Sequence, residues 1–238
     1  MKELIKKILY LLHLDITKNQ QYDRQTHLIM QNVIKQDSNC IDVGCHKGEM
    51  LQLMLTRAKK GKHYAFEPIP YMYNHLKQNF RSQPVEVFPL ALSNKEGETE
   101  FNIVKDDPAY SGMRQRKYKT ENPVIEKIKV KMSRLDDVIA PGTKIDFIKI
   151  DVEGAEFHVM EGAKRILTEN HPIVIFECGL GASDFYETKP EQVFDLLHSC
   201  KLKISLMKNW LNKKPALKKE EFVKIYNDNS DYYFIAHP

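Results

Sequence analysis

The residues best suited to chemistry are three acidic side chains that each follow a short, mainly apolar run. These residues are Glu67, Asp151 and Glu177. Such runs are typical of strands in an open parallel sheet, and ligands bind at the carboxyl ends of those strands. A carboxylate there can take a proton from a hydroxyl, hold a cation or accept hydrogen bonds from a ribose. The pattern favours an enzyme that uses a nucleotide-like cofactor.

A glycine-bearing turn at residues 44–48 follows another apolar run. A dinucleotide site has the pattern G-x-G-x-x-G, whose middle glycine lets the backbone approach a pyrophosphate. Here His46 stands at that middle position, which disfavours NAD and FAD and favours a ligand without phosphates. S-adenosylmethionine is such a ligand, and Asp42 with the backbone N–H groups of the turn would hold its amino-acid end. Glu67, 23 positions after Gly44, is close to the spacing of about 20 that places a carboxylate on a ribose.

Two charged side chains interrupt a run that should be buried on both faces of the sheet. Lys149 and Asp151 lie on the same face of this run, two residues apart. Burying a charge without a partner costs several kcal/mol. The two side chains must therefore satisfy each other, a third group or a ligand.

Several motifs of the chain resemble those of the FkbM family of S-adenosylmethionine-dependent methyltransferases, over about residues 40–177. The most specific match is the string FIKIDVEGAE at residues 147–156. The other matches are residues 42–44 with Gly48, residues 66–68 and 91–93, Ser111 with Gly112, and residues 135–137. The resemblance implies an α/β class I methyltransferase fold, Rossmann-like, with a mostly parallel seven-stranded sheet, an antiparallel last strand and helices on both faces. It also implies O-methylation of hydroxyls on sugars, glycans or macrolides.

The resemblance also implies roles for individual residues. It places Asp42, Gly44 and Glu67 on the cofactor and Ser93 near the adenine, although Ser93 could equally be a simple turn residue. The full set of expected cofactor contacts is Asp42, Gly44, His46, Gly48, Glu67, Pro68, Ser93 and Asp151.

Methyl transfer to a hydroxyl requires the acceptor oxygen to be held about 3 to 3.5 Å from the methyl carbon, and a base to take its proton. The candidate bases are Asp151, Glu153, Glu177 and His46. We expect the carboxylates to carry the chemistry, with Lys149 orienting them. Glu153 and Glu156 could instead only stabilise the N-terminus of the following helix.

Three carboxylates at one edge could also hold a divalent cation, which would lower the pKa of the acceptor. Because no His or Asp stands at tight ligand spacing, we expect no metal site. Two alternative functions stay open. One is methylation of a small-molecule amine or phenol, with or without a metal, and the other is a cofactor-binding module without catalysis.

The elements that must position these residues alternate between strand and helix patterns, which implies right-handed crossovers and a parallel sheet. We predict strands at residues 40–43, 63–66, 86–92, 146–150, 173–176, 203–207 and 232–236. Helices are predicted at residues 23–35, 49–59, 71–80, 155–167 and 191–200.

One region follows a different period. Residues 98–104 and 128–132 alternate apolar and polar side chains, which predicts an antiparallel hairpin inserted at the sheet edge. The polar loop between them is long enough to be functional. Its candidates for binding the acceptor are Tyr110, Ser111, Arg114, Arg116 and Lys117.

Composition limits the remaining possibilities. At 238 residues we expect a single methyltransferase domain, with a helical N-terminal segment at residues 1–38 and a Rossmann-like core at 39–238. The content of 42% hydrophobic and 29% charged residues is ordinary for a soluble globular protein. No apolar run approaches the roughly 20 residues that a spanning helix needs, and the start has no small-residue cleavage site. We therefore expect a cytoplasmic protein.

The expected partners follow from charge and sulfur content. A net charge of +4 is too small to indicate nucleic acid. The resemblance to the FkbM family implies a small-molecule or glycan acceptor. The amphipathic pattern at residues 1–14 is compatible with contact with a membrane surface, but we expect it to pack on the core. The four cysteines form no C-x-x-C pair and should be reduced. The oligomeric state is left open.

Overall fold

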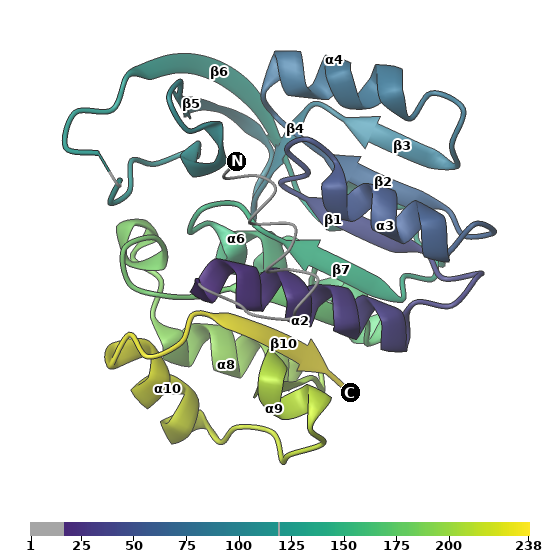
Figure 1. Cartoon of the computed structure of the whole chain (residues 1–238), viewed down its shortest axis with the longest axis vertical. Helices are drawn as coiled ribbons and strands as arrows, with labels where there is room; N and C mark the ends of the chain where they lie inside the picture. Colours follow the sequence, from purple (N-terminus) through teal and green to yellow (C-terminus); the bar gives the residue numbers. More distant parts are fainter. Residues whose placement is uncertain (1–16, 119) are drawn as a thin grey trace, which may run out of the picture.

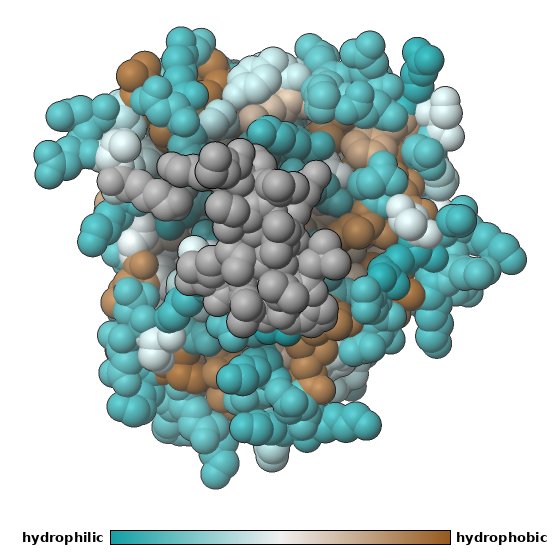
Figure 2. Space-filling model, viewed as in Figure 1, coloured by the Kyte–Doolittle hydropathy of each residue, from teal (hydrophilic) through white to brown (hydrophobic). Residues whose placement is uncertain are grey.

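The computed structural model describes residues 17–118 and 120–238. The amphipathic segment expected at residues 1–14, with its possible membrane contact, lies outside the described residues. Within the described ranges, no helix combines the length and the apolar character needed to cross a bilayer. Hydrophilic side chains cover most of the coloured part of the face shown in Figure 2.

A seven-stranded sheet with helices on both faces forms the centre of the molecule (Figure 1). In spatial order its strands are β3 (Val85–Phe88), β2 (His63–Phe66), β1 (Cys40–Val43), β7 (Phe147–Ile150), β8 (Ile173–Glu177), β10 (Tyr233–His237) and β9 (Lys203–Leu206). Strands β3, β2, β1, β7 and β8 pair in parallel. Strand β10 runs antiparallel to both of its neighbours. The predicted α/β fold with a reversed last strand is confirmed.

Helices pack on the two faces of this sheet. They are α2 (Lys18–Val33), α3 (Glu49–Arg57), α4 (Pro70–Asn79), α5 (Leu135–Val138), α6 (Glu156–Glu161), α7 (Lys164–Asn170), α8 (Pro190–Ser199), α9 (Met207–Leu211) and α10 (Lys219–Asn227). Successive side chains of a strand point to opposite faces, so the core is divided in two. Phe147 packs in a cluster with residues of α2 and α9, whereas Ile148 packs in a cluster with residues of α6, α7 and α8. The cysteines are free and buried, as predicted.

The single strand predicted at residues 86–92 was wrong, because the structure has two strands there. Pro89 separates β3 from β4 (Leu90–Leu92), and proline has no N–H with which to continue a ladder. Strand β4 leaves the main sheet and pairs with β6 (Ile125–Ser133). Strand β5 (Gly97–Val104) completes a second sheet in the order β4-β6-β5.

The predicted hairpin is confirmed as antiparallel, because β5 and β6 pair over their whole length. Its expected place at the edge of the main sheet was wrong. Since β4 pairs with β6, the hairpin belongs to the smaller sheet, which stands beside the carboxyl ends of the main strands (Figure 1).

Two helix predictions also differ from the structure, and three helices were not predicted. Residues 155–167 form two helices, α6 and α7, and Gly162 lies between them with its backbone packed tightly on that of Ser93. Helix α2 begins at Lys18, because Thr17 and Gln20 form a capping box there. The short helices α5 and α9, and the longer α10, were not predicted.

Candidate active site

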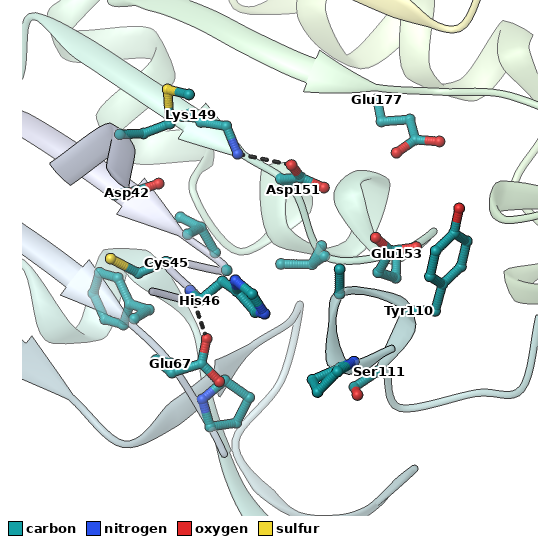
Figure 3. A pocket seen from close by; sticks show the side chains of 18 of the residues that line it. Asp42, Cys45, His46, Glu67, Tyr110, Ser111, Lys149, Asp151, Glu153 and Glu177 are labelled. Atoms are coloured by element: carbon teal, nitrogen blue, oxygen red, sulfur yellow. Dashed lines mark hydrogen bonds and ion pairs between the residues drawn. The ribbon is translucent and has the colours of Figure 1, made fainter. Parts of the chain in front are cut away.

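A cleft of about 660 Å³ lies over the carboxyl ends of β1, β2, β7 and β8 (Figure 3). This volume is typical of a site for a small organic ligand. Its walls come from segments far apart in the sequence: α2, the glycine turn after β1, strand β4, the loop after β5, and the start of β10. The predicted convergence of strand ends on one site is therefore present.

The glycine turn is fixed to the strands on both sides. Gly44 has φ +78°, and a Cβ added to it would overlap the backbone oxygen of Asp151. The N–H groups of Gly44 and Cys45 donate to the Phe66 carbonyl at 3.0 and 3.1 Å. The His46 N–H donates to Glu67 Oε2 at 2.8 Å. These three N–H groups are thus already used within the chain and are not free to hold the amino-acid end of the cofactor.

The side chain of His46 lines the cleft, and no described residue partners its buried Nε2. Burial lowers its pKa, so the imidazole is neutral at pH 7.

Glu67 is buried at the end of β2 and lines the cleft. Besides the His46 contact, its Oε1 accepts a hydrogen bond from the Ile69 N–H at 2.9 Å. Burial raises the pKa of this carboxyl to about 7, against the opposing effect of the two N–H groups. Because a carboxylate oxygen can accept two hydrogen bonds, each oxygen of Glu67 can still take one more donor.

Lys149 and Asp151 satisfy each other, as their shared face predicted. Lys149 Nζ lies 2.8 Å from Asp151 Oδ2, and the Tyr233 hydroxyl donates to the same oxygen at 3.0 Å. Burial acts to raise the pKa of Asp151, but these two donors and the charge of Lys149 outweigh it and lower the pKa. For Lys149, burial acts to lower the pKa, and the carboxylates of Asp151 and Asp42 outweigh it and raise the pKa.

Asp42 lies beside Lys149 in the ladder between β1 and β7 and is only 1% exposed. Neither of its carboxylate oxygens accepts a hydrogen bond of ordinary geometry from the described chain. Burial raises its pKa, partly offset by the charge of Lys149 and the nearby Cys45 thiol. An unsatisfied buried carboxylate at the bottom of a cleft can bind a cationic or hydrogen-bond-donating ligand.

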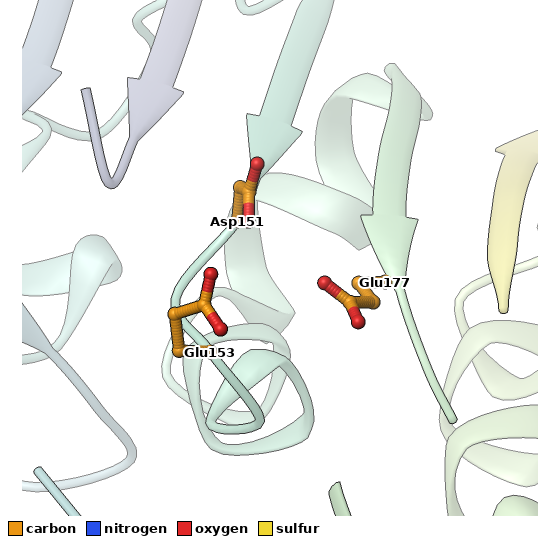
Figure 4. A group of neighbouring side chains, drawn as sticks. All are labelled: Asp151, Glu153 and Glu177. Atoms are coloured by element: carbon orange, nitrogen blue, oxygen red, sulfur yellow. The ribbon is translucent and has the colours of Figure 1, made fainter. Parts of the chain in front are cut away.

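Three carboxylates from the ends of β7 and β8 meet at the far side of the cleft (Figure 4). One oxygen each of Asp151, Glu153 and Glu177 lies within 4.8 Å of the other two. Glu153 forms an ion pair with Arg116. Burial, reinforced by the negative charges of Glu156 and Asp151, raises the pKa of Glu177 to about 8.

Glu156 has the local structural role that was considered for it. Its Oε1 accepts hydrogen bonds from the Val152 and Gly154 N–H groups at 3.0 and 3.2 Å, which fixes the turn between β7 and α6. Glu153 does not share that role, because its carboxylate faces the cleft and Arg116.

The loop after β5 brings three of its five candidate residues to the cleft. Tyr110 and Ser111 line it, and the Ser111 hydroxyl accepts a hydrogen bond from the Val104 N–H at 3.0 Å. Arg114 does not line it, because its guanidinium donates to the Phe185 carbonyl at 2.7 Å. Arg116 occupies the cleft instead, with its guanidinium 5.1 Å from the centre of the Tyr110 ring.

Two predicted cofactor residues also lie outside the cleft lining. Ser93 is buried, its N–H donates to the Ser133 carbonyl, and its hydroxyl lies 3.5 Å from Asn94 Oδ1. Gly48, at φ +83°, precedes α3 and leaves no room for a Cβ beside Leu76. Pro68 does line the cleft.

Sequence reasoning missed the contribution of the last strand and of Asp23 in α2. Tyr232 and Tyr233 line the cleft from the start of β10, and Asp23 lines it from α2. A signal for the tyrosines existed, since a reversed last strand begins at the edge where the parallel strands end. For Asp23 the sequence carried no comparable signal.

Comparison with known proteins places the chain in a family. Residues 42–204 match the family model described as the methyltransferase FkbM domain. The 2-O-methyltransferase NoeI of Sinorhizobium fredii is 28% identical over 148 residues, which cover 57% of this chain and 61% of that protein. The hexuronic acid methyltransferase AglP of Haloferax volcanii is 28% identical over 178 residues, which cover 73% of this chain and 67% of that protein.

A solved structure shows the same fold. The methyltransferase FkbM from Methylobacillus flagellatus KT matches with a TM-score of 0.52 at 16% identity, over 85% of this chain and 44% of that one. Because the family model matches residues 42–204, more than half of the chain, the chain belongs to the FkbM methyltransferase family.

Proposed function

We propose that the protein transfers a methyl group from S-adenosylmethionine to a hydroxyl group of a sugar or glycoconjugate. The observation that carries the proposal is that one cleft joins Glu67 at the end of β2 to the three carboxylates at the ends of β7 and β8. The chain belongs to a methyltransferase family, and its relatives include a 2-O-methyltransferase and a hexuronic acid methyltransferase.

The residues present fit the cofactor. Glu67 has free acceptor capacity for the ribose hydroxyls. The buried Asp42 carboxyl has no hydrogen-bond partner of ordinary geometry among the described residues and can accept a hydrogen bond from the cofactor. Lys47, exposed at the cleft, replaces the occupied N–H groups of the turn as the donor for the carboxylate end. When bound, S-adenosylmethionine supplies an electrophilic methyl group on a sulfonium sulfur.

Glu177 is the residue that takes the proton from the acceptor hydroxyl. Lys149 and Tyr233 hold Asp151, and Arg116 holds Glu153, whereas no described residue hydrogen-bonds to the Glu177 carboxylate. Its pKa of about 8 is close to physiological pH, which suits a general base. Such a base contributes roughly 10²- to 10⁴-fold to the rate. Tyr110 and Arg116 form the wall that faces the acceptor.

The test has two parts. Calorimetric titration should show S-adenosylmethionine binding, and an assay against neutral saccharides, uronic acids, phenols and amines should give an O-methylated saccharide. Glu177→Gln should lower kcat about 10²- to 10⁴-fold and leave the cofactor Kd unchanged. Glu187→Gln is the matched control, since that glutamate is exposed outside the cleft.

Each adverse result has a separate meaning. If the cofactor does not bind, the proposed function is wrong, and an N-methylated product would decide for the amine alternative. Cofactor binding without turnover on any acceptor would favour a binding module. Full activity of Glu177→Gln would remove the base assignment alone.

The close approach of three carboxylates also suits a metal-assisted variant. We propose a metal-free reaction, because Lys149 and Arg116 already supply positive charge to Asp151 and Glu153. Activity should therefore survive EDTA. A loss on chelation that Mg²⁺ or Mn²⁺ restores would establish the metal-assisted variant instead.

A further inference from the structure

The last strand of the sheet delivers a hydroxyl to the acidic cluster. Because β10 is antiparallel, its first residue, Tyr233, lies at the edge where β7 and β8 end, and it pairs with Glu177 in the ladder. Its hydroxyl reaches Asp151 Oδ2 at 3.0 Å. Burial and the negative charges of Asp151 and Glu177 raise the pKa of Tyr233, so the phenol stays protonated and donates this hydrogen bond.

Both donors to Asp151 use the same oxygen. Lys149 Nζ and the Tyr233 hydroxyl each contact Oδ2, at 2.8 and 3.0 Å. No described residue donates to Oδ1, although the Asp151 side chain lines the cleft. Figure 3 shows Lys149 reaching one oxygen of Asp151 while the other points away from it.

The tyrosine ring is itself held in place. It packs against the ring of Tyr22 of α2, with ring centres 4.9 Å apart. The Tyr22 hydroxyl donates to Asp231 Oδ1 at 2.7 Å, and the same oxygen accepts the Tyr232 N–H at 3.0 Å. Helix α2 and the residues before β10 therefore fix the direction of the Tyr233 hydroxyl.

The neighbouring tyrosine provides a natural comparison. Tyr232 also lines the cleft, but its hydroxyl donates to Asn19 Oδ1 at 2.9 Å. The two residues have the same chemistry, adjacent positions and a hydroxyl hydrogen bond each. They differ in that only Tyr233 contacts Asp151.

We propose that Tyr233 is a positioning residue that, together with Lys149, holds Asp151 as an anion with Oδ2 occupied, so that Oδ1 is presented to the reacting groups. The inference rests on the proposed methyl transfer. In that reaction, Asp151 orients the reacting groups and supplies negative charge, and it does not take the proton.

The kinetic test compares two single-atom deletions. Tyr233→Phe should lower kcat about 10- to 100-fold with little change in the acceptor KM, since a hydrogen bond to a charged group is lost. Tyr226→Phe removes a hydroxyl that lies outside the cleft and donates to the Thr188 carbonyl at 3.5 Å, and it should stay within about 2-fold of wild type. In an Asp151→Asn background, adding Tyr233→Phe should lower kcat by less than about a further 2-fold, because the hydrogen bond that it removes is already altered. Thermal unfolding of each variant checks that the fold is kept.

A second measurement does not depend on activity. In proton NMR, the Tyr233 hydroxyl should give a downfield resonance that is absent in Tyr233→Phe and moves upfield in Asp151→Asn. A resonance that Asp151→Asn leaves unchanged overturns the inference. So does a loss of kcat in Tyr226→Phe equal to that in Tyr233→Phe, or a full additional loss of kcat when Tyr233→Phe is combined with Asp151→Asn. If the wild-type protein methylates no hydroxyl, the proposed function fails, while the resonance still decides whether the contact exists.

Discussion

Glu67 shows how one carboxylate is oriented before any ligand arrives. Its two oxygens accept the His46 and Ile69 N–H groups, so its position is fixed by the turns after β1 and β2. Glu67→Gln replaces one acceptor with an NH₂ group that faces a backbone N–H. We expect S-adenosylmethionine affinity to fall roughly 10- to 100-fold, measured by calorimetry. Glu86→Gln, an exposed glutamate paired with Lys62, should leave the Kd unchanged. Equal affinities for the two variants would contradict the ribose role.

Glu177 should set the pH dependence of the reaction. The base must be deprotonated to act, and burial raises its pKa to about 8. Below that pH the active fraction falls about tenfold per unit, so kcat/KM should rise with pH and level off above about 8. A pH–rate profile of wild type and Glu177→Gln measures this, and the variant should not show the rise of kcat/KM below pH 8. If the rise of kcat/KM with pH persists in Glu177→Gln, it belongs to the titration of another group.

Side-chain chemistry in the strands was easier to predict than side-chain direction in the loops. The Lys149–Asp151 pair followed from the cost of burying two charges in one strand. For Arg114 and Ser93 the sequence identified the right segments but not which side chains face the cleft. The contacts of Arg114 with the loop after β8 depend on a meeting of distant segments that spacing does not encode.

At the scale of elements, the junction between the turn after β1 and the end of β7 depends on one glycine. Gly44 combines a positive φ with a backbone contact to Asp151 that leaves no room for a Cβ, whereas Gly142 has φ +79° and nothing within 4 Å of an added Cβ. Gly142→Ala should therefore cost only the strain of the left-handed backbone, about 1 kcal/mol. Gly44→Ala should cost several kcal/mol, since backbone atoms must also move.

Denaturant unfolding of both variants separates the two contributions. If Gly44→Ala and Gly142→Ala lose equal stability, the close approach of the two segments is not needed for the fold.

The elements that sequence predicted best are those buried on both faces. Strands β1 and β2 have the predicted bounds, because short, mainly apolar runs between polar turns define them. The run at residues 86–92 was misread because apolar character continues through Pro89 while the backbone changes sheet. Hydrophobic pattern reports burial but not which neighbour a strand pairs with.

For the whole molecule, raised carboxyl pKa values predict how stability depends on pH. Burial raises the pKa of Glu67 and Glu156 to about 7 and that of Glu177 to about 8, from 4.5. Between these values the folded state binds more protons than the unfolded state, so stability falls as pH rises. Each group contributes at most about 1.4 kcal/mol per pH unit, and less where water reaches it.

Urea unfolding at pH 5, 6, 7 and 8 should therefore show a decreasing free energy of unfolding. Glu177→Gln should make the free energy of unfolding fall less steeply with pH, most clearly between pH 6 and 8. Asp151 acts in the opposite direction, but only at acid pH, because its pKa is lowered. Stability that rises over this interval would show that the carboxylates are ionised in the folded protein.

The architecture as a whole was predictable from motifs and alternation, and the resemblance supplied the reversed last strand. What that reversal brings to the cleft was not predictable, because Tyr233 reaches Asp151 only through the three-dimensional arrangement of β7, β8 and β10.

Strand β10 is made after β9 but lies between β8 and β9. While the ribosome is still adding residue 207, β9 has no neighbour with which to pair, and the cleft lacks the wall formed by Tyr232 and Tyr233. A nascent chain therefore exposes an incomplete sheet edge until residue 237 has emerged, and a proteolytic cut before residue 232 would remove both the partner of β9 and one side of the cleft.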